Sequence, residues 1–308
     1  MHEFNNRFCL YFLLPVCMIL TACNNPVTVD ELESNVREFL SSEPGQFAVF
    51  FQSVDDPGLG FAIHPDTLFH AASTMKTPVM IEVYKQASKG IFSLEDSLEI
   101  KNTFYSIVDS SEFSIDLQPV SDDPETNDPL EQRIGEKESI YNLTRAMMTY
   151  SSNLATNIII GLVGADNTTR TMRELGADNI LVLRGLYDMK AFERGLSNRT
   201  TARDLGIIFE HLAKGTAVSP DADRNMIQIL KGQHYRDVIP ASLPADVEIA
   251  NKTGSIDGVE HDSALVFLPD GRTYVLIFLS KHLPDDNRGR EVGAKVSEMV
   301  NHFMLRNE

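Results

Sequence analysis

Ser73 and Lys76 stand three residues apart at the start of a stretch whose pattern predicts a helix over 73–88. In a helix this spacing puts the hydroxyl and the amine on one face, about a turn apart, so the lysine can reach the serine oxygen. A serine hydroxyl is a weak nucleophile that needs a base within hydrogen-bond reach. The pair therefore suggests a serine nucleophile with a lysine base, although surface helices often carry this spacing without any chemistry.

Two further strings strengthen that interpretation. Ser151-Ser152-Asn153 lies between two predicted helices, and Lys252-Thr253-Gly254-Ser255 lies on a predicted strand. The patterns S-x-x-K, S-x-N and K-T-G occur once each, in the order that is typical of serine β-lactamases and penicillin-binding proteins. Together they predict an active site assembled from three distant parts of the chain.

The intervening sequence must bring these three strings together. Apolar periodicity predicts helices over 28–41, 73–88, 139–150, 154–163, 167–176, 202–214, 219–231 and 288–304, and strands over 46–54, 60–64, 247–255, 261–269 and 273–281. Strands near both ends with helices between them predict an α/β (α+β) fold, in which one antiparallel sheet is built from both termini with flanking helices and an inserted all-helical subdomain. We expect the α/β part over about 28–90 and 236–308, and the helical part over about 91–235.

The chain resembles class A β-lactamase-related serine hydrolases over nearly all of residues 28–308. The resemblance rests on HAASTMKTPVM, SSNLATNIII, the Thr-Thr-x-Arg-Asp stretch at 200–204, and KTGS followed by a two-strand hairpin. It implies a serine β-lactamase-like fold in which Ser73 forms an ester with Lys76 as base. It further implies that Ser151 passes a proton to the departing nitrogen, and that the backbone N–H groups of Ser73 and Ser255 form the oxyanion hole.

The same resemblance implies the substrate-binding groups. Asn153 is expected to hold the carbonyl of the substrate side chain and to orient the catalytic lysine. Lys252, Thr253 and Ser255 are expected to hold the substrate carboxylate from an edge strand. Gly254 is expected to let the substrate backbone approach that strand.

One position departs from the family pattern in a way that affects the chemistry. Class A β-lactamases carry Arg-x-Glu before the Thr-Thr stretch, and the glutamate activates the water that hydrolyses the acyl-enzyme. Here Arg184 stands where the arginine is expected, but Leu186 takes the place of the glutamate. Because general-base catalysis typically contributes about 10²–10⁴ in rate, we expect the ester to persist. Asp188 and Glu193 on the same loop are alternative bases.

Three other features have open interpretations. Ser152 replaces the usual aspartate of the second motif. The polar stretch 100–138 is either a wall of the cleft or, as we favour, a surface excursion. His261 and Asp262 are either a substrate-side or base-orienting pair, or strand side chains near the rim.

Composition excludes some classes of function. The 308 residues include 44 Asp and Glu against 27 Lys and Arg, a net charge of −17 without any conspicuous basic run, so nucleic acid is not an expected partner. The sequence has neither an HExxH string nor a Cys/His cluster, so we expect no metal and no cofactor.

Residues 1–22 are typical of a lipoprotein signal peptide. Arg7 precedes an apolar run over 8–20, which is short for a membrane span. The following Leu-Thr-Ala-Cys resembles a bacterial lipobox, which implies lipidation of Cys23. We therefore expect export to the periplasmic side of the cell envelope with a lipid anchor in the membrane. Asn24 favours the outer membrane if the source has two membranes.

These observations favour hydrolysis of a β-lactam through an acyl-enzyme, slowed by the loss of the glutamate. One alternative is a D,D-peptidase or other cell-wall transacylase acting on a D-Ala-D-Ala-like substrate. The other is a non-catalytic penicillin-binding lipoprotein of the envelope. In each case we expect a small-molecule ligand and a monomer.

Overall fold

The computed structural model describes Met1, residues 27–117 and residues 128–306. The predicted signal peptide and Cys23 lie outside the described residues, as does part of the polar stretch 100–138.

A five-stranded antiparallel sheet forms the middle of the molecule, in the order β2-β1-β11-β10-β9. Its strands are β1 (Gln46–Ser53), β2 (Gly60–Ile63), β9 (Glu248–Ile256), β10 (Val259–Phe267) and β11 (Thr273–Lys281). β1 pairs with β11 along its whole length, from Gln46 opposite Lys281 to Ser53 opposite Tyr274. The prediction of one antiparallel sheet built from both termini is therefore confirmed. β9, which carries the Lys-Thr-Gly-Ser string, is an edge strand.

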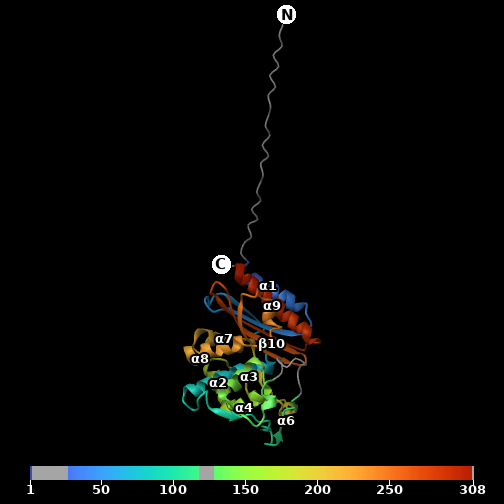
Figure 1. Ribbon diagram of the computed structural model, residues 1–308. Coiled ribbons are helices and arrows are strands. Elements are labelled where there is room, and N and C mark those ends of the chain that lie inside the picture. The colour runs from blue at the N-terminus through green and yellow to red at the C-terminus, as the bar shows by residue number, and fades with distance from the viewer. Residues whose placement is uncertain (2–26, 118–127, 307–308) are drawn as a thin grey trace.

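Helices cover both faces of this sheet (Figure 1). α1 (Val29–Ser41) and α9 (Asp286–Arg306) lie on one face, and their apolar side chains share a core with it. α7 (Ala202–Lys214) packs on the other face. At Gly206 of α7 a Cβ atom would lie 2.4 Å from the ring of Phe50, so glycine allows this close contact with β1. Because both faces are covered, β10 and β11 are buried along nearly their whole length.

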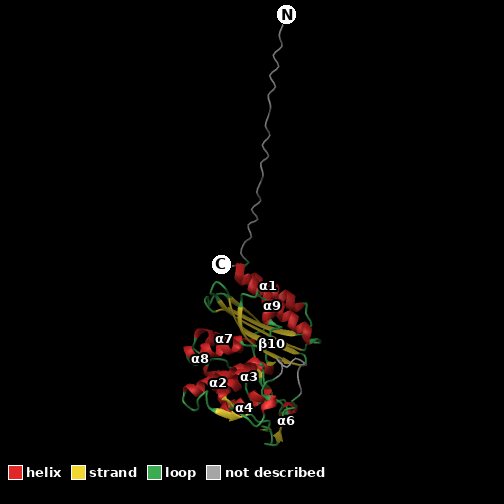
Figure 2. Cartoon of the chain, viewed as in Figure 1, coloured by secondary structure: helices red, strands yellow, loops and turns green. Residues whose placement is uncertain are grey.

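Beyond α7 lies a further layer of helices (Figure 2), made of α2 (Lys76–Ser88), α3 (Ile140–Thr149), α4 (Asn153–Val163) and α5 (Ala165–Glu174). α8 (Pro220–Lys231) lies beside α7 and packs on β9. α2 packs against α4 and α5, while α7 packs on the sheet, so the packing does not divide at residues 90 and 236. One continuous core joins this layer to the sheet. None of the described helices is long and apolar enough to cross a membrane.

The sequence pattern does not predict the shortest elements. They are the pairs β3 (Phe69–His70) with β8 (Arg199–Thr200), β4 (Ser97–Glu99) with β7 (Lys137–Ser139), and β5 (Phe104–Tyr105) with β6 (Glu112–Phe113), together with α6 (Met189–Glu193). Elements of two to five residues are too short to show a period. The predicted helix over 73–88 is also wrong at its start, where a 3₁₀ turn over Ala72–Met75 precedes α2.

Candidate active site

Ser73 lies on this 3₁₀ turn, at the entrance to α2. Ala72, immediately before it, has φ of +44°, a conformation that costs energy for a residue with a side chain. Ser73 is half-buried and lines a cavity of about 520 Å³. The cavity is also lined by His70, Ala72, Asn153, Arg184, Leu186, Tyr187, Met189, Phe192, Ser255, Ile256 and Asp257. The turn thus presents the hydroxyl of Ser73 to a space large enough for a small ligand.

Lys76 is the first residue of α2 and is fully buried. Its Nζ donates to the carbonyl oxygen of Ser151 at 2.6 Å and to Asn153 Oδ1 at 3.0 Å, and lies 3.0 Å from Ser151 Oγ. Burial and, secondarily, the charge of Lys252 lower the pKa of Lys76 well below its usual value. Among the described residues no hydrogen bond joins Ser73 Oγ to this amine. Lys76 is therefore bound to the second motif, and the lowered pKa favours the neutral form of its amine.

Lys252 approaches the same serine from the sheet. It is fully buried on β9, and its Nζ lies 3.1 Å from Ser151 Oγ and donates to the carbonyl of Thr253 at 2.9 Å. Burial lowers its pKa to about 7, although the carboxylate of Asp262 acts in the opposite direction. The Ser151 hydroxyl is thus in contact with two buried amines, an arrangement that suits proton transfer.

Gly254 brings the third motif against the first. A Cβ atom at this position would lie 3.0 Å from the backbone nitrogens of both Ser73 and Thr74. Packing within the chain therefore favours glycine here, whereas the family resemblance attributes this glycine to the approach of a substrate. The N–H of Ser73 makes no hydrogen bond within the part of the chain that the structure describes, so it is available to an oxyanion, and Ser255 follows Gly254 along the edge strand.

Asp128 belongs to the site although the sequence analysis missed it. Ser152 accepts a hydrogen bond from the N–H of Ala155 at 2.9 Å, which caps α4, and donates its own hydroxyl to Asp128 Oδ2. The charge of Asp128 acts to raise the pKa of Lys76. Burial in turn raises the pKa of the Asp128 carboxyl. A carboxylate from the polar stretch thus accompanies the second motif, in which Ser152 replaces an aspartate. The replacement of that aspartate by Ser152 was the one sequence feature that could have indicated a carboxylate supplied from elsewhere in the chain.

Leu186 lies on the wall of the Ser73 cavity. Asn157 of α4 fixes its backbone from both sides, donating from Nδ2 to the carbonyl at 2.9 Å and accepting from the N–H at 2.6 Å. Arg184 donates to the carbonyls of Leu196 at 2.7 Å and Gly185 at 2.9 Å, which ties together the two ends of the loop. An apolar side chain therefore lines the same cavity as Ser73.

Asp188 does not line that cavity. Its carboxylate is buried and accepts hydrogen bonds from Ser106 Oγ at 2.9 Å, the N–H of Ile107 at 2.9 Å and the N–H of Ala191 at 3.1 Å. These bonds cap α6 and anchor the polar stretch to the loop. Glu193, at the exposed end of α6, does not line the cavity either. Neither alternative base is therefore beside Ser73.

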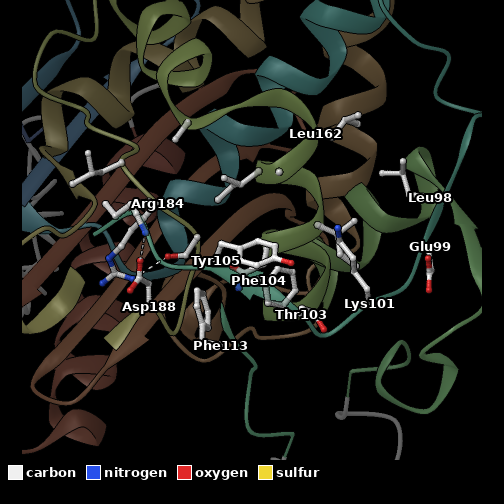
Figure 3. Close-up of a pocket in the computed structure, with 18 residues that line it drawn as sticks. Leu98, Glu99, Lys101, Thr103, Phe104, Tyr105, Phe113, Leu162, Arg184 and Asp188 are labelled. Carbon is white, nitrogen blue, oxygen red and sulfur yellow. Dashed lines mark hydrogen bonds between the residues drawn. The ribbon is translucent and has the colours of Figure 1, made fainter. Parts of the chain in front are cut away.

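Asp188 instead borders a second cavity of about 520 Å³ (Figure 3). Phe104, Tyr105 and Phe113 line it, with Arg184 and Asp188 at one end. Several residues between Lys101 and Phe113 line this second cavity, and no described residue of the stretch 100–138 lines the Ser73 cavity. The described part of the stretch therefore does not form a wall of the Ser73 cavity, and hydrogen bonds to Asp188 anchor it to the Leu186 loop.

His261 and Asp262 are fully buried in β10, so the rim position and the substrate-side position are both wrong. The ring of His261 accepts from the N–H of Ser280 at Nδ1, 3.1 Å, and its Nε2 lies 2.9 Å from the carbonyl of His70. This fixes the Nε2–H tautomer, and burial lowers the pKa of His261 to about 4. Burial raises the pKa of Asp262 to about 6, and its charge acts on Lys252. Asp262 thus influences the site without touching the cavity.

Among the described residues no group of three or more His, Cys, Asp or Glu side chains is arranged to hold a metal ion.

Comparisons with known proteins give a matching family model and several similar chains. A family model described as "Beta-lactamase enzyme family" matches residues 31–304. Beta-lactamase VEB-1 of Pseudomonas aeruginosa is 21% identical over 309 residues, covering 92% of each chain. The solved structure of PBP-A is 26% identical with a TM-score of 0.74, covering 89% of this chain and 96% of that one. A Leu-to-Glu variant of PBP-A, solved as an acyl-enzyme complex with penicillin G, is 25% identical with a TM-score of 0.75, covering 91% and 98%.

Proposed function

The chain belongs to the beta-lactamase enzyme family, and on that basis we propose that it is a serine hydrolase that takes up a β-lactam as an acyl group on Ser73 and releases it slowly. One observation carries this proposal. Two buried amines meet at Ser151 Oγ, and Leu186 lines the same cavity as Ser73 at the position where the family pattern has a glutamate. The site is equipped for forming the ester and poorly equipped for hydrolysing it.

Acylation is proposed to use these groups in the following order. Ser73 Oγ attacks the lactam carbonyl, and the neutral amine of Lys76 accepts its proton. The backbone N–H groups of Ser73 and Ser255 stabilise the oxyanion, and a donor of this kind is worth about 2.7–4 kcal/mol of barrier. The C–N bond then breaks, and the nitrogen receives a proton from Ser151, which regains one from the neighbouring amines.

Hydrolysis of the ester requires an activated water. No carboxylate on the Leu186 loop lines the cavity within the described residues, because Asp188 and Glu193 are both directed elsewhere. Without such a base the rate is expected to fall by about 10²–10⁴. The acyl-enzyme is therefore expected to accumulate.

Time-resolved intact-mass spectrometry with penicillin G tests this proposal. We expect a persistent adduct with the mass of the intact penicillin, and none with Ser73→Ala. Absence of both adduct and turnover would refute the acyl-enzyme, and rapid turnover with no accumulation would refute slow release.

A second candidate is a D,D-peptidase or related cell-wall transacylase. The groups proposed for acylation by a β-lactam can also accept an acyl group from a peptide. Leu186 in place of a water-activating glutamate is compatible with transfer of that acyl group to an acceptor other than water. Release of D-alanine from a D-Ala-D-Ala peptide distinguishes it. Release at a rate above that of penicillin turnover favours this candidate.

We also propose that the protein is exported to the cell envelope and lipid-anchored at Cys23. The support is the apolar run over 8–20 followed by Leu-Thr-Ala-Cys. Metabolic labelling with a fatty acid is expected to mark the wild type and to leave Cys23→Ser unlabelled. Labelling of both would contradict the proposed anchor.

A further inference from the structure

The ring of His70 holds the backbone just before the nucleophile. His70 belongs to β3 and lines the Ser73 cavity, and its Nδ1 accepts the N–H of Ala72 at 3.0 Å. Ala72 has φ of +44°, so the ring bonds the strained point of the turn. A nitrogen that accepts carries no proton, so the neutral ring has its proton on Nε2. The bond therefore exists only while His70 is neutral.

Other hydrogen bonds fix the same segment. Thr74 donates from its N–H and its Oγ1 to the carbonyl of Ala71 at 3.0 and 2.6 Å. His261 Nε2 donates to the carbonyl of His70 at 2.9 Å, and burial lowers the pKa of His261 to about 4. Among these bonds, the one from Ala72 to His70 is therefore the one that a proton breaks first as the pH falls.

The position of the ring is defined by its neighbours. His70 pairs with Arg199 across β3 and β8, which fixes its backbone. Phe192 of α6 packs edge-on against the ring, with the two ring centroids 6.4 Å apart. The imidazole is thus held at the turn by the sheet pair on one side and by an aromatic side chain on the other.

The charged surroundings favour the neutral ring. Burial and, secondarily, the charge of Arg184 lower the pKa of His70. Within the described residues no carboxylate is hydrogen-bonded to the ring. The titratable and charged groups on the elements around it are Arg184 and Tyr187 of the Leu186 loop, Arg199 of β8, His261 of β10, Asp257 of the β9–β10 turn, and Lys190 and Glu193 of α6.

We propose that His70 is a positioning residue for the acylation of Ser73, holding the turn before the nucleophile when its ring is neutral and releasing it when protonated. The inference rests on the proposed function, because its effect is read in the formation of the ester. A proton on Nδ1 faces the N–H of Ala72, so two donors oppose each other and the strained turn loses its bond. The N–H of Ser73 follows directly in the chain, so its direction toward an oxyanion is disturbed and acylation slows.

The rate of acylation by penicillin G, measured by intact-mass spectrometry from about pH 8 to about pH 5, tests the proposal. His70→Asn keeps an oxygen acceptor near the position of Nδ1 but does not titrate. We expect its rate, divided by that of the wild type, to lie near one at about pH 8 and to rise about tenfold as the wild-type histidine is protonated. The titration of Lys76 is common to both proteins and cancels in this ratio. His70→Leu, which has no acceptor, is expected to be about tenfold slower than the wild type at about pH 8.

His302→Asn is the matched control, since it replaces an exposed histidine of α9 outside the cavity, and its ratio is expected to stay near one throughout. A ratio for His70→Asn that does not change with pH overturns the inference and leaves the acyl-enzyme intact, because a purely structural role of the ring gives no such dependence. A wild-type rate for His70→Leu also overturns it. If His70→Leu does not fold, the pH dependence of His70→Asn decides. Absence of any adduct on the wild type across the pH range overturns the proposed function, and with it the role of His70 in acylation.

Discussion

Replacing Leu186 with glutamate is expected to convert a persistent ester into one that turns over. The backbone of this residue is held by Asn157 through bonds of 2.9 and 2.6 Å, so a new side chain starts from the same point on the cavity wall. A carboxylate there supplies the general base that the wild type lacks, and such a base is worth about 10²–10⁴ in rate. We expect hydrolysis of the ester to accelerate about 10²-fold, the lower end of that range, because the surrounding loop has not been shaped around a water.

The cost to stability is expected to be modest. Leu186 is half-buried, so the lost apolar burial is about 1 kcal/mol, half of what a fully buried leucine contributes. Arg184 lines the same cavity and offsets part of the cost of placing a carboxylate there. The midpoint temperature of thermal unfolding should therefore fall by a few degrees at most for a chain of this size.

The assay is a pulse of penicillin G followed by intact-mass measurement of the decay of the adduct. Leu186→Gln is the matched control, because it has the same size without a base. Fast decay with glutamate and slow decay with glutamine is the expected result. Equal decay in the two variants would refute the reasoning that a missing carboxylate limits hydrolysis.

Two further changes probe the acylation step and the packing behind it. Asp128→Asn removes a charge that raises the pKa of Lys76, so that pKa should fall further and more of the amine should be neutral at a given pH. In a plot of acylation rate against pH, the acidic limb should then move to lower pH. A shift of that limb to higher pH would contradict this role of Asp128. Gly254→Ala places a Cβ atom 3.0 Å from two backbone nitrogens, so the turn or the strand must move. We expect it to cost about 1–3 kcal/mol in denaturant unfolding and to slow acylation, and a variant with wild-type stability and rate would show that the contact tolerates a methyl group.

The strands, the helices and the chemistry of the three motif strings could be predicted because each is encoded in a short contiguous segment of the sequence. Strands with alternating or continuous apolar residues near both ends of the chain are sufficient to predict one antiparallel sheet built from both termini, whereas the pairing of β1 with β11 comes from the structure. Ser73, Lys76 and Lys252 each stand within a contiguous string, so their chemistry is visible before any contact is known.

Features that depend on burial or on distant pairing could not be predicted in this way. Asp128 joins Ser152 across 24 residues of sequence, from a stretch whose composition indicates only a surface loop. His261 and Asp262 are polar residues on a strand, which suggests an exposed face, but helices cover both sides of β10 and the two side chains are satisfied internally. The role of Gly254 depends on where another segment packs, which a single string does not reveal.

The pairing of β1 with β11 makes the protein dependent on its whole length. Because β1 pairs with β11, the sheet cannot be completed until residues 273–281 have been synthesised, and folding must bring together segments more than 200 residues apart. A chain that ends before β9 lacks the strand that lies against Ser73, so we expect such a fragment to have no activity. Two fragments separated in the loop between α7 and α8 would each be inert, and recovery of acylation on mixing would report that they had reassembled.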